Sequence, residues 1–266
     1  MKILVIHGSM RKGNTYTLAK EVMDRLAKKP DVEIIEYSVA ELDLPFCISC
    51  HVCFSKGEAS CPHFGRLERV TSALLECDGL ILSGVSYVRA LNGAMKNLID
   101  HFAYFFHRPA LFGKHGMVIA TSAGTGERRV ARYLRNVMGQ WGVNGALIVT
   151  QNAKKQRLQS SPKAAKRLDE AAERFYQRIQ SKQRISPSAQ NIAVHNAFRA
   201  MLLSEFTDAP ADTRYWQQSG FSDRAYPVKT NPVKYLIGAL TYRAANAAIR
   251  VVGRSYKKKQ KDSSTL

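Results

Sequence analysis

The chain has 266 residues, of which 45% are apolar and 23% are charged, and it contains no run of about 18 apolar residues. This length accommodates one large α/β domain, or a smaller domain with an extension. The composition argues against a disordered chain, a collagen-like chain and a membrane-spanning helix, and indicates a globular protein.

The net charge of +19 is distributed unevenly along the chain. Residues 1–151 carry 18 basic and 13 acidic side chains, whereas residues 152–266 carry 22 basic and 8 acidic side chains. A basic surface attracts nucleic acid, anionic lipid or an anionic cofactor, and the charge alone does not choose among these partners. The N-terminal apolar run is shorter than that of a secretory signal, so we expect a cytoplasmic protein whose cysteines form no disulfide framework.

Five short apolar runs have the length and composition of β-strands. They lie at residues 2–6, 32–39, 79–84, 116–121 and 146–150. Helical patterns lie between most of them, at residues 15–28, 66–76, 91–106 and 127–141. Because parallel strands need crossover connections, this alternation predicts an α/β fold with a doubly wound, five-stranded parallel sheet.

The remaining chain suggests two further features, a long connection and a helical extension. The connection at residues 40–65 holds four of the five cysteines, and long loops inside compact domains are usually functional. Further helical patterns lie near residues 163–183, 191–205 and 232–252. We therefore expect a first domain over residues 1–184, with the Cys-rich loop inside it, and a basic helical extension over residues 185–266.

The loop after the first strand, HGSMRKGNTYTLA, has the composition of an anion site. The amides at a helix N-terminus are unsatisfied and the helix dipole adds positive charge there, while Ser9, Asn14 and Thr15 offer hydrogen bonds and Arg11 offers a fixed charge. The glycines match neither the Rossmann nor the P-loop pattern, so the loop suits one terminal phosphate. The alternative is an ordinary turn in which Thr15 or Asn14 caps the helix.

Three motifs together resemble the NADPH-dependent FMN reductase family, whose fold is flavodoxin-like. The first is GSMRKGNTYTLA, which is similar to the family's phosphate loop. The second is GLILSGVSYVRALNGAMKNLIDHF, which is similar to its flavin-ring segment except that Val85 stands where the family usually has Pro and His101 where it usually has Arg. The third, weaker match is TSAGTGE at residues 121–127.

The resemblance covers roughly residues 1–151 and implies that FMN is the cofactor. The phosphate would be bound by the first loop, and the flavin ring by the backbone after the third predicted strand, with the ring of Tyr87 available for stacking. The implied cofactor-binding residues are Ser9, Arg11, Asn14, Thr15, Ser83, Val85, Ser86, Tyr87, Val88, Ser122 and Gly124. Lys96 and Asp100 on the following helix are expected to form a surface pair.

The cysteines of the long connection are spaced C-x2-C-x2-C-x7-C, at Cys47, Cys50, Cys53 and Cys61. This spacing favours an iron–sulfur centre over zinc, which prefers two well-separated C-x2-C pairs. It also resembles the motif of iron–sulfur flavoproteins, in which a [4Fe-4S] cluster passes electrons to FMN. Unmetallated thiols and a zinc site are the alternatives, and Cys77 is expected in the core.

The C-terminal region is similar to the tail of family members, where it packs subunits together. We therefore expect a homo-oligomer, a dimer or tetramer, and assign Tyr215 and Trp216 to packing. The final basic stretch predicts an amphipathic helix with Leu236, Leu240 and two alanines, Ala244 and Ala248, in line. The favoured interpretation docks this helix on the body or on a partner subunit, and the rival interpretation lays it on an anionic membrane surface.

These observations predict an FMN-dependent oxidoreductase that passes electrons from NAD(P)H or a reduced carrier to a quinone, a small acceptor or a protein. Hydride transfer requires no side-chain acid or base, so no catalytic residue is predicted. The alternatives are a non-enzymatic electron-transfer flavoprotein and, less favoured, a nucleic-acid-binding or membrane-surface protein. No nucleic-acid-binding module is recognised in the chain, which argues against nucleic acid as a partner.

Overall fold

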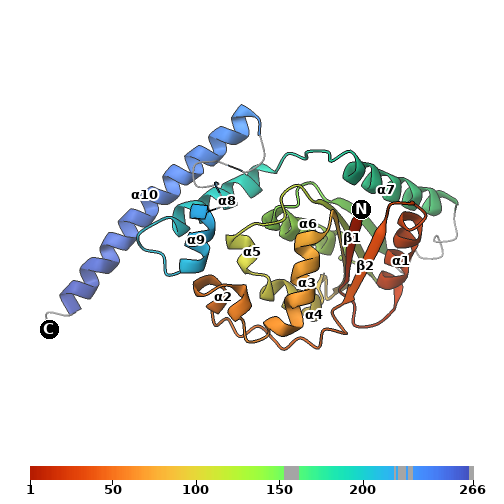
Figure 1. Ribbon diagram of the computed structural model, residues 1–266, viewed down its shortest axis with the longest axis horizontal. Coiled ribbons are helices and arrows are strands. Elements are labelled where there is room, and N and C mark those ends of the chain that lie inside the picture. Colours follow the sequence, from red (N-terminus) through yellow and green to blue (C-terminus); the bar gives the residue numbers. More distant parts are fainter. Residues whose placement is uncertain (153–161, 219, 221–225, 227–229, 264–266) are drawn as a thin grey trace. The chain divides into compact units, whose positions relative to one another are not determined.

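A computed structural model describes residues 1–152, 162–218, 220, 226 and 230–263, with side chains described up to residue 253 (Figure 1). The strands of the first half are β1 (Lys2–His7), β2 (Glu33–Ser38), β3 (Gly79–Tyr87), β4 (Ala90–Leu91), β5 (His115–Ser122) and β6 (Leu147–Asn152). The helices up to α6 are α1 (Asn14–Leu26), α2 (Val52–Ser55), the 3-10 helix η1 (Glu58–Ser60), α3 (Phe64–Glu76), α4 (Gly93–His101), α5 (Tyr104–His107) and α6 (Glu127–Trp141). The later helices are α7 (Pro162–Gln180), α8 (Ala189–Leu202), α9 (Pro210–Gln218) and α10 (Pro232–Ser263).

The sheet has the strand order β2-β1-β3-β5-β6, and all four of these pairings are parallel. The short strand β4 pairs antiparallel with the end of β3. This order confirms the predicted doubly wound α/β fold of the flavodoxin-like type. The strand order runs in opposite directions from the boundary between β1 and β3. The loops after β1, β3 and β5 lie at the carboxyl edge of the parallel strands, where open α/β sheets bind ligands.

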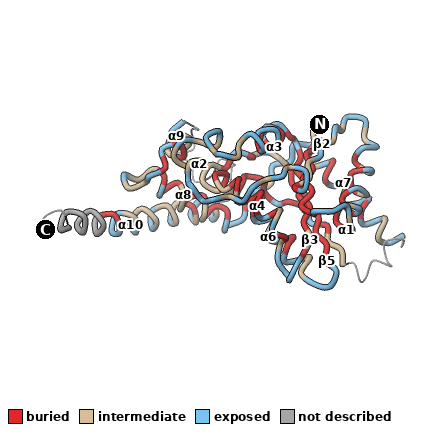
Figure 2. Tube along the Cα trace, turned by 90° about the horizontal axis from the view of Figure 1, so that it is seen from below, coloured by how far each residue is buried: buried red, intermediate tan, exposed pale blue. Residues whose placement is uncertain are grey.

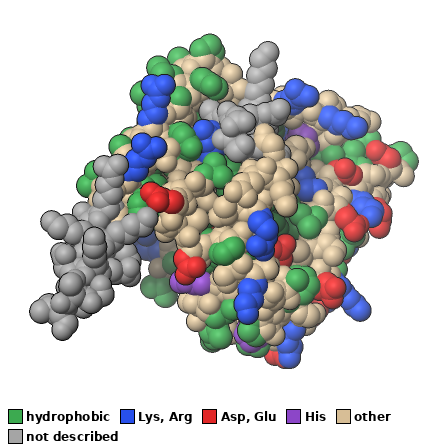
Figure 3. Space-filling model, turned by 60° about the vertical axis from the view of Figure 1, so that its left-hand side comes forward, with side chains coloured by type: hydrophobic (Ala, Val, Ile, Leu, Met, Phe, Trp, Pro, Cys, Tyr) green, Lys and Arg blue, Asp and Glu red, His purple; other side chains and the backbone are tan. Residues whose placement is uncertain are grey.

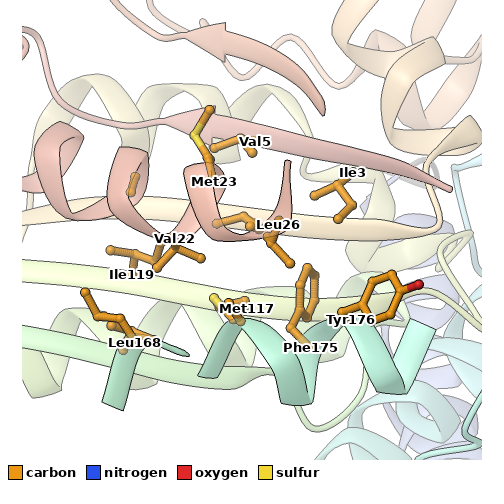
Figure 4. Close-up of a cluster of buried hydrophobic side chains, with 14 of the residues drawn as sticks. Ile3, Val5, Val22, Met23, Leu26, Met117, Ile119, Leu168, Phe175 and Tyr176 are labelled. Atoms are coloured by element: carbon orange, nitrogen blue, oxygen red, sulfur yellow. The ribbon is translucent and has the colours of Figure 1, made fainter. Parts of the chain in front are cut away.

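One face of the sheet is covered by α1 and α7 (Figure 4). Alternate residues of the strands, such as Ile3, Val5 and Ile119, point to this face because successive side chains of a strand point to opposite sides. They pack with Val22 of α1 and Phe175 of α7, and all five side chains are buried. The apolar residues of α1 and α7 recur at helical spacing, so each helix presents one apolar face, and this face packs on the apolar side of the sheet.

The opposite face of the sheet is covered by α3, α4 and α6. The alternate strand residues Leu4, Leu80 and Val118 are fully buried on this side. Trp141 at the end of α6 is also fully buried, with its ring edge toward Phe102 at 5.8 Å between ring centres. Figure 2 shows the resulting pattern, in which buried residues concentrate along the central strands.

The chain divides into two compact units. The first comprises residues 1–50, 62–103 and 109–185, and contains the whole sheet. The second comprises residues 51–61, 104–108 and 186–266, so that α2, η1 and α5 belong with the C-terminal helices. Among the described helices, none combines the length and the apolar character that crossing a membrane would require.

The second unit is built around a buried charged group and a buried tryptophan. Asp212 of α9 is fully buried, and its carboxylate meets Nδ1 of His107 at 2.6 Å and Nε of Arg108 at 2.8 Å. Trp216 is also fully buried and donates its indole N–H to the carbonyl of His107. Tyr215 packs edge-on against Trp216, so the predicted packing role of this pair is confirmed.

The structure differs from the predicted helices in three places. Ala90 and Leu91 form β4, and the predicted helix at residues 91–106 is broken into α4 and α5. The short helix α9 was not predicted, because only two turns follow Pro210. In α10, Leu236, Leu240, Ala244 and Ala248 are exposed, so this row of residues does not pack within the second unit, and docking of the helix on a partner subunit stays a prediction.

Candidate functional site

The loop between β1 and α1 has the features of an anion site. Gly13 precedes α1 with no side-chain cap, and the first turn of the helix contains no acidic residue. The exposed side chains of Arg11 and Lys12 lie just before it. Asn14 and Thr15 therefore do not act as the N-cap of this helix. An uncapped helix start next to two cations favours binding of a phosphate.

Gly8 joins this loop to the loop after β3. Its N–H donates to the carbonyl of Ser83 at 2.9 Å, and its own carbonyl accepts the side-chain N–H of Asn92 at 2.6 Å. A Cβ at Gly8 would lie 2.5 Å from the Ser83 oxygen and 2.9 Å from Cγ of Met95. Only glycine fits such a close approach of two backbones, so the first glycine of the motif serves loop packing.

The loops after β3 and β5 are joined in the same way. The hydroxyl of Ser86 donates to the carbonyl of Thr125 at 3.1 Å, and the neighbouring Gly126 has φ +107, which favours glycine. Asn152 at the end of β6 donates to the carbonyl of Gly124. The three loops are thus held together by direct hydrogen bonds and form one preorganised platform, which we call the loop platform (residues 8–13, 83–92 and 122–126).

Several predicted site residues use their hydroxyl groups inside the protein. The Thr15 and Thr121 hydroxyls lie 2.6 Å apart and both residues are buried. Ser83 donates to the carbonyl of Ile6, and Ser122 donates to the carboxylate of Glu127. These side chains fix the loops, so the groups left to contact a ligand at these positions are chiefly backbone amides.

The turn between β3 and β4 is strained and fully exposed. Val88 and Arg89 have φ of 49° and 62°, values that L-residues with branched side chains rarely adopt. A two-residue hairpin turn of this kind usually contains Asn and Gly. The side chain of Val88 is 100% exposed and that of Tyr87 is 52% exposed, whereas Val85 is half-buried. Strain of this kind is held by the surrounding structure and is typical of ligand-binding turns.

A cleft of about 340 Å³ lies beside the phosphate loop, on its β2 side. Its lining brings together Ser9, Arg11 and Ser83 of the predicted residues with His7 and Glu36. The remaining predicted residues do not line this cleft; they are Asn14, Thr15, Val85, Ser86, Tyr87, Val88, Ser122 and Gly124. His7 is buried, its Nε2 lies 3.1 Å from the Glu36 carboxylate, and burial lowers its pKa although Glu36 opposes the shift.

Two residues of this region were missed by the sequence reasoning. Asn92, between Leu91 and the glycine that begins α4, is 3% exposed and holds Gly8. The only signal for it in the sequence is its place just before a helix, where Asn is a common cap. His7 is the last residue of β1, and a polar residue at the end of a buried strand was the available signal.

The first part of the Cys-rich loop is fixed by two residues of α4. The side-chain N–H of Asn97 donates to the carbonyls of Leu44 and Pro45, and its oxygen accepts the N–H of Cys47 at 3.0 Å. Nε2 of His101 lies 2.9 Å from the carbonyl of Pro45. His101, which stands where the FMN reductase family usually has Arg, therefore anchors this loop.

Within the part of the chain that the structure describes, the four cysteines of the loop form no disulfide bond, and they differ in exposure. Cys50 is exposed, while Cys47, Cys53 and Cys61 are half-buried. Among the residues that the structure describes, no three Cys, His, Asp or Glu side chains are grouped so that they could hold a metal ion. Cys47 and Cys50 belong to the first unit, whereas Cys53 and Cys61 belong to the second, so the predicted set of four cluster ligands stays a prediction. Cys77 is buried as predicted, and burial raises the pKa of its thiol to about 11.

The predicted surface pair on α4 is present. Lys96 and Asp100 form an ion pair, and both side chains are nearly half-exposed. A pair of this kind contributes little to stability, because its charges remain solvated. It offers no sign of a catalytic role.

Comparison with known proteins agrees with these features. A protein-family model for NADPH-dependent FMN reductases matches residues 1–155. An iron–sulfur flavoprotein of Methanocaldococcus jannaschii is 33% identical over 101 residues, which are 38% of this chain and 51% of the relative. An NADPH azoreductase of a Bacillus species is 29% identical over 112 residues, which are 41% of this chain and 55% of the relative. The matched stretch thus spans about half the length of these two relatives.

Among solved structures, the apo form of an NADH:FMN oxidoreductase is similar with a TM-score of 0.51 and 23% identity. The match covers 65% of this chain and 87% of that protein. At this identity the likeness concerns the fold alone. The family model, in contrast, matches more than half of the chain and includes the whole loop platform. The chain belongs to the NADPH-dependent FMN reductase family.

Proposed function

We propose that this protein binds FMN on the loop platform and is an FMN-dependent oxidoreductase. The observation that carries the proposal is the hydrogen-bonded connection of the loops after β1, β3 and β5, through Gly8, Asn92 and Ser86. Ligands bind at this edge of doubly wound sheets, and binding is favoured when the groups that contact the ligand are already in place.

The residues of the first loop fit the phosphate of FMN. The uncapped N-terminus of α1 supplies backbone N–H groups. The Arg11 guanidinium supplies a positive charge and can donate hydrogen bonds to the phosphate oxygens. Ser9 is buried beside Arg11 in the wall of the cleft. Asn14 is exposed at the first position of the helix. These four contributions favour a dianionic terminal phosphate over a dinucleotide.

The residues of the second and third loops fit the flavin ring. Ser86 and Ser122 hold their loops through their hydroxyls and leave backbone amides for the ring edges. Tyr87, half-exposed in the strained turn, offers an aromatic face for stacking, and the exposed Val88 offers apolar contact. When bound, FMN supplies the hydride and electron transfer chemistry, while the protein binds and orients it.

We propose NAD(P)H or a reduced carrier as the electron donor, and a quinone, a small acceptor or a protein as the acceptor. The relatives support this choice, since one is named an NADPH azoreductase and a structural neighbour an NADH:FMN oxidoreductase. If FMN binds but neither NADH nor NADPH reduces it, the alternative of a non-enzymatic electron-transfer flavoprotein is favoured.

A [4Fe-4S] cluster held by the four cysteines of the long loop is a second proposal, separate from FMN binding. The relatives named iron–sulfur flavoproteins favour one, and four thiols are the ligand set that a [4Fe-4S] cluster requires. The described side chains, however, include no group of three ligands placed to hold a metal. Iron and sulfide analysis of protein purified without oxygen decides between a bound cluster and unmetallated thiols. About four iron atoms per chain would support the cluster, and no iron would support unmetallated thiols.

The proposed function is tested with purified apo protein. FMN is added and binding is followed by the quenching of flavin fluorescence, after which NADH or NADPH is added without oxygen and bleaching of the flavin absorbance is recorded. The proposal expects stoichiometric binding and bleaching by at least one of the two donors. The variant Lys28→Gln, which removes an exposed charge away from the loop platform, is expected to behave like the natural protein.

A further inference from the structure

Helix α10 presents two unlike faces along its described length. On one face, Gly238 and Gly253 are buried, and a Cβ at Gly253 would lie 2.6 Å from the ring of Phe206. Tyr242 on the same side packs under the guanidinium of Arg199, 3.9 Å from its ring centre. Close packing through glycines therefore fixes which face of α10 packs against the rest of the second unit, and leaves the other face exposed.

The outward face of α10 is apolar over five turns. Its residues follow one another at intervals of three or four positions, so they form one stripe along the helix. The members of this stripe are Val233, Leu236, Leu240, Ala244, Ala247 and Val251. All six are exposed, and the exposed fractions of the four larger side chains lie between 55% and 67%. We call this set the outer stripe.

Basic residues border the outer stripe. Arg243 and Arg250 are exposed and follow the stripe at a spacing of seven residues. Figure 3 shows hydrophobic and basic side chains close together on the upper left part of the surface. Over its whole length the α10 sequence contains eight Lys or Arg residues and one acidic residue.

We propose that the outer stripe of α10 docks on an anionic lipid surface, with the helix lying parallel to the membrane plane. Amphipathic helices with an apolar stripe and basic borders bind membranes in this manner, because the apolar side chains enter the acyl boundary while the cations contact anionic headgroups. Basic residues near such a surface each add to the attraction. The long side chains of Arg243 and Arg250 reach the headgroups while the stripe is buried.

Charge complementarity favours lipid over a second copy of this chain. Two α10 helices facing each other would bring sixteen basic side chains together, and the whole chain carries a net charge of +19. Like charges at an interface oppose association. Nucleic acid matches the charge as well, but its phosphate backbone offers no apolar surface that would bury the outer stripe. An anionic membrane is the partner that satisfies both the charge and the stripe.

The test is flotation of the full chain, loaded with FMN, on vesicles. One set of vesicles contains phosphatidylcholine alone, and the other contains phosphatidylcholine mixed with phosphatidylglycerol. The proposal expects flotation with the anionic vesicles, little with the neutral ones, and a loss of flotation as the salt concentration rises. Equal flotation with both kinds of vesicle, or none with either, would overturn it.

Two variants separate the apolar and the charged contributions. Leu236→Ser combined with Leu240→Ser is expected to weaken binding to anionic vesicles by about tenfold or more, because each replaces a buried aliphatic group at the membrane. Arg243→Gln combined with Arg250→Gln is expected to weaken it in low salt only. Leu75→Ser, at an apolar side chain 48% exposed on α3, is the matched control and should bind like the natural protein.

Two results would assign the stripe to another partner. Both double variants are also tested for binding to duplex DNA. If the double serine variant keeps its vesicle binding and only the double arginine variant loses DNA binding, the partner is nucleic acid and not lipid. If the double serine variant changes the oligomeric state measured by light scattering, the stripe is an interface between copies. FMN content and circular dichroism of each variant verify that it is folded.

Discussion

His107 and Asp212 lie 2.6 Å apart in a buried hydrogen bond that joins helix α5 to helix α9, 105 residues later in the chain. Arg108, next in sequence to His107, contacts the same carboxylate and reaches Glu58 at 3.0 Å and the carbonyl of Cys53 at 2.9 Å. The second half of the Cys-rich loop is thus tied to the C-terminal helices by one buried acidic residue.

Replacing Asp212 should destabilise the protein strongly. In Asp212→Asn the carboxylate is lost, and the largely buried Arg108 keeps only the carboxylate of Glu58, a more exposed residue, as an ion-pair partner. Breaking a buried charged network in this way costs about 3 kcal/mol. Denaturant unfolding of Asp212→Asn and of Asp208→Asn, where the side chain is exposed, measures the difference. Equal free energies of unfolding in the two variants would contradict this role of Asp212.

Replacing Arg11 should weaken binding of FMN and leave binding of riboflavin unchanged. The Arg11 side chain is exposed beside the uncapped start of α1, so its contribution is made to the phosphate that riboflavin lacks. A charge-assisted hydrogen bond of this kind corresponds to about a tenfold change in affinity. Fluorescence titrations of Arg11→Gln and of Lys28→Gln with both flavins measure it. Equal losses for the two flavins would show that Arg11 acts through the fold.

Replacing Val88 should raise stability. Its φ of 49° is costly for a β-branched residue, and its side chain is fully exposed and packs against nothing that it would lose. Val88→Asn places a residue that tolerates this conformation in the turn, and should raise the free energy of unfolding by about 1 kcal/mol. Val88→Ala keeps the strained conformation and should change it little. A stability of Val88→Asn no higher than that of Val88→Ala would refute the strain.

The unfolding free energy should fall as the pH falls below about 6.5, and His195 should contribute to this decrease. Burial lowers the pKa of His195 from 6.5 to about 3. The unfolded chain therefore binds a proton at His195 near pH 6.5, whereas the folded chain does so only near pH 3. Between these two pH values the free energy of unfolding decreases by up to about 1.4 kcal/mol for each pH unit that the pH falls. The contribution of the neutral, buried His195 to stability is fully present above pH 6.5.

The pH prediction is measured by denaturant unfolding between pH 7 and pH 5. The variant His195→Gln should show a shallower dependence of the unfolding free energy on pH, whatever its stability at pH 7. The variant His51→Asn, at an exposed histidine, should keep the slope of the natural protein. Identical slopes in all three proteins would contradict the burial of a neutral imidazole at position 195.

Much of the fold could be predicted from local patterns. The strand that ends at His7 follows from a continuous apolar run, and the helix that ends at Trp141 follows from apolar residues at helical spacing; both patterns depend on neighbouring residues alone. The end of the first strand also fixes where the phosphate loop begins. The predicted phosphate loop, flavin-ring segment and third loop therefore meet at one edge of the sheet.

The rest depended on contacts between residues far apart in the sequence. The hydroxyl pair of Thr15 and Thr121 spans 106 residues, and the pattern around neither residue predicts it. The docked face of α10 is selected by the small residues Gly238 and Gly253, which composition-based patterns rank below leucine. The apolar row at Leu236 therefore did not reveal which face packs against the rest of the second unit, since an exposed stripe and a buried stripe have the same helical period.

The most direct measurement of the central claim compares FMN with riboflavin in binding to the natural apo protein. If the loop after β1 binds the phosphate, FMN should bind about a hundredfold more tightly than riboflavin, and this advantage should shrink in Arg11→Gln. Equal affinities for the two flavins, or no binding of FMN at all, would contradict the assignment of the phosphate loop and the redox function that depends on it.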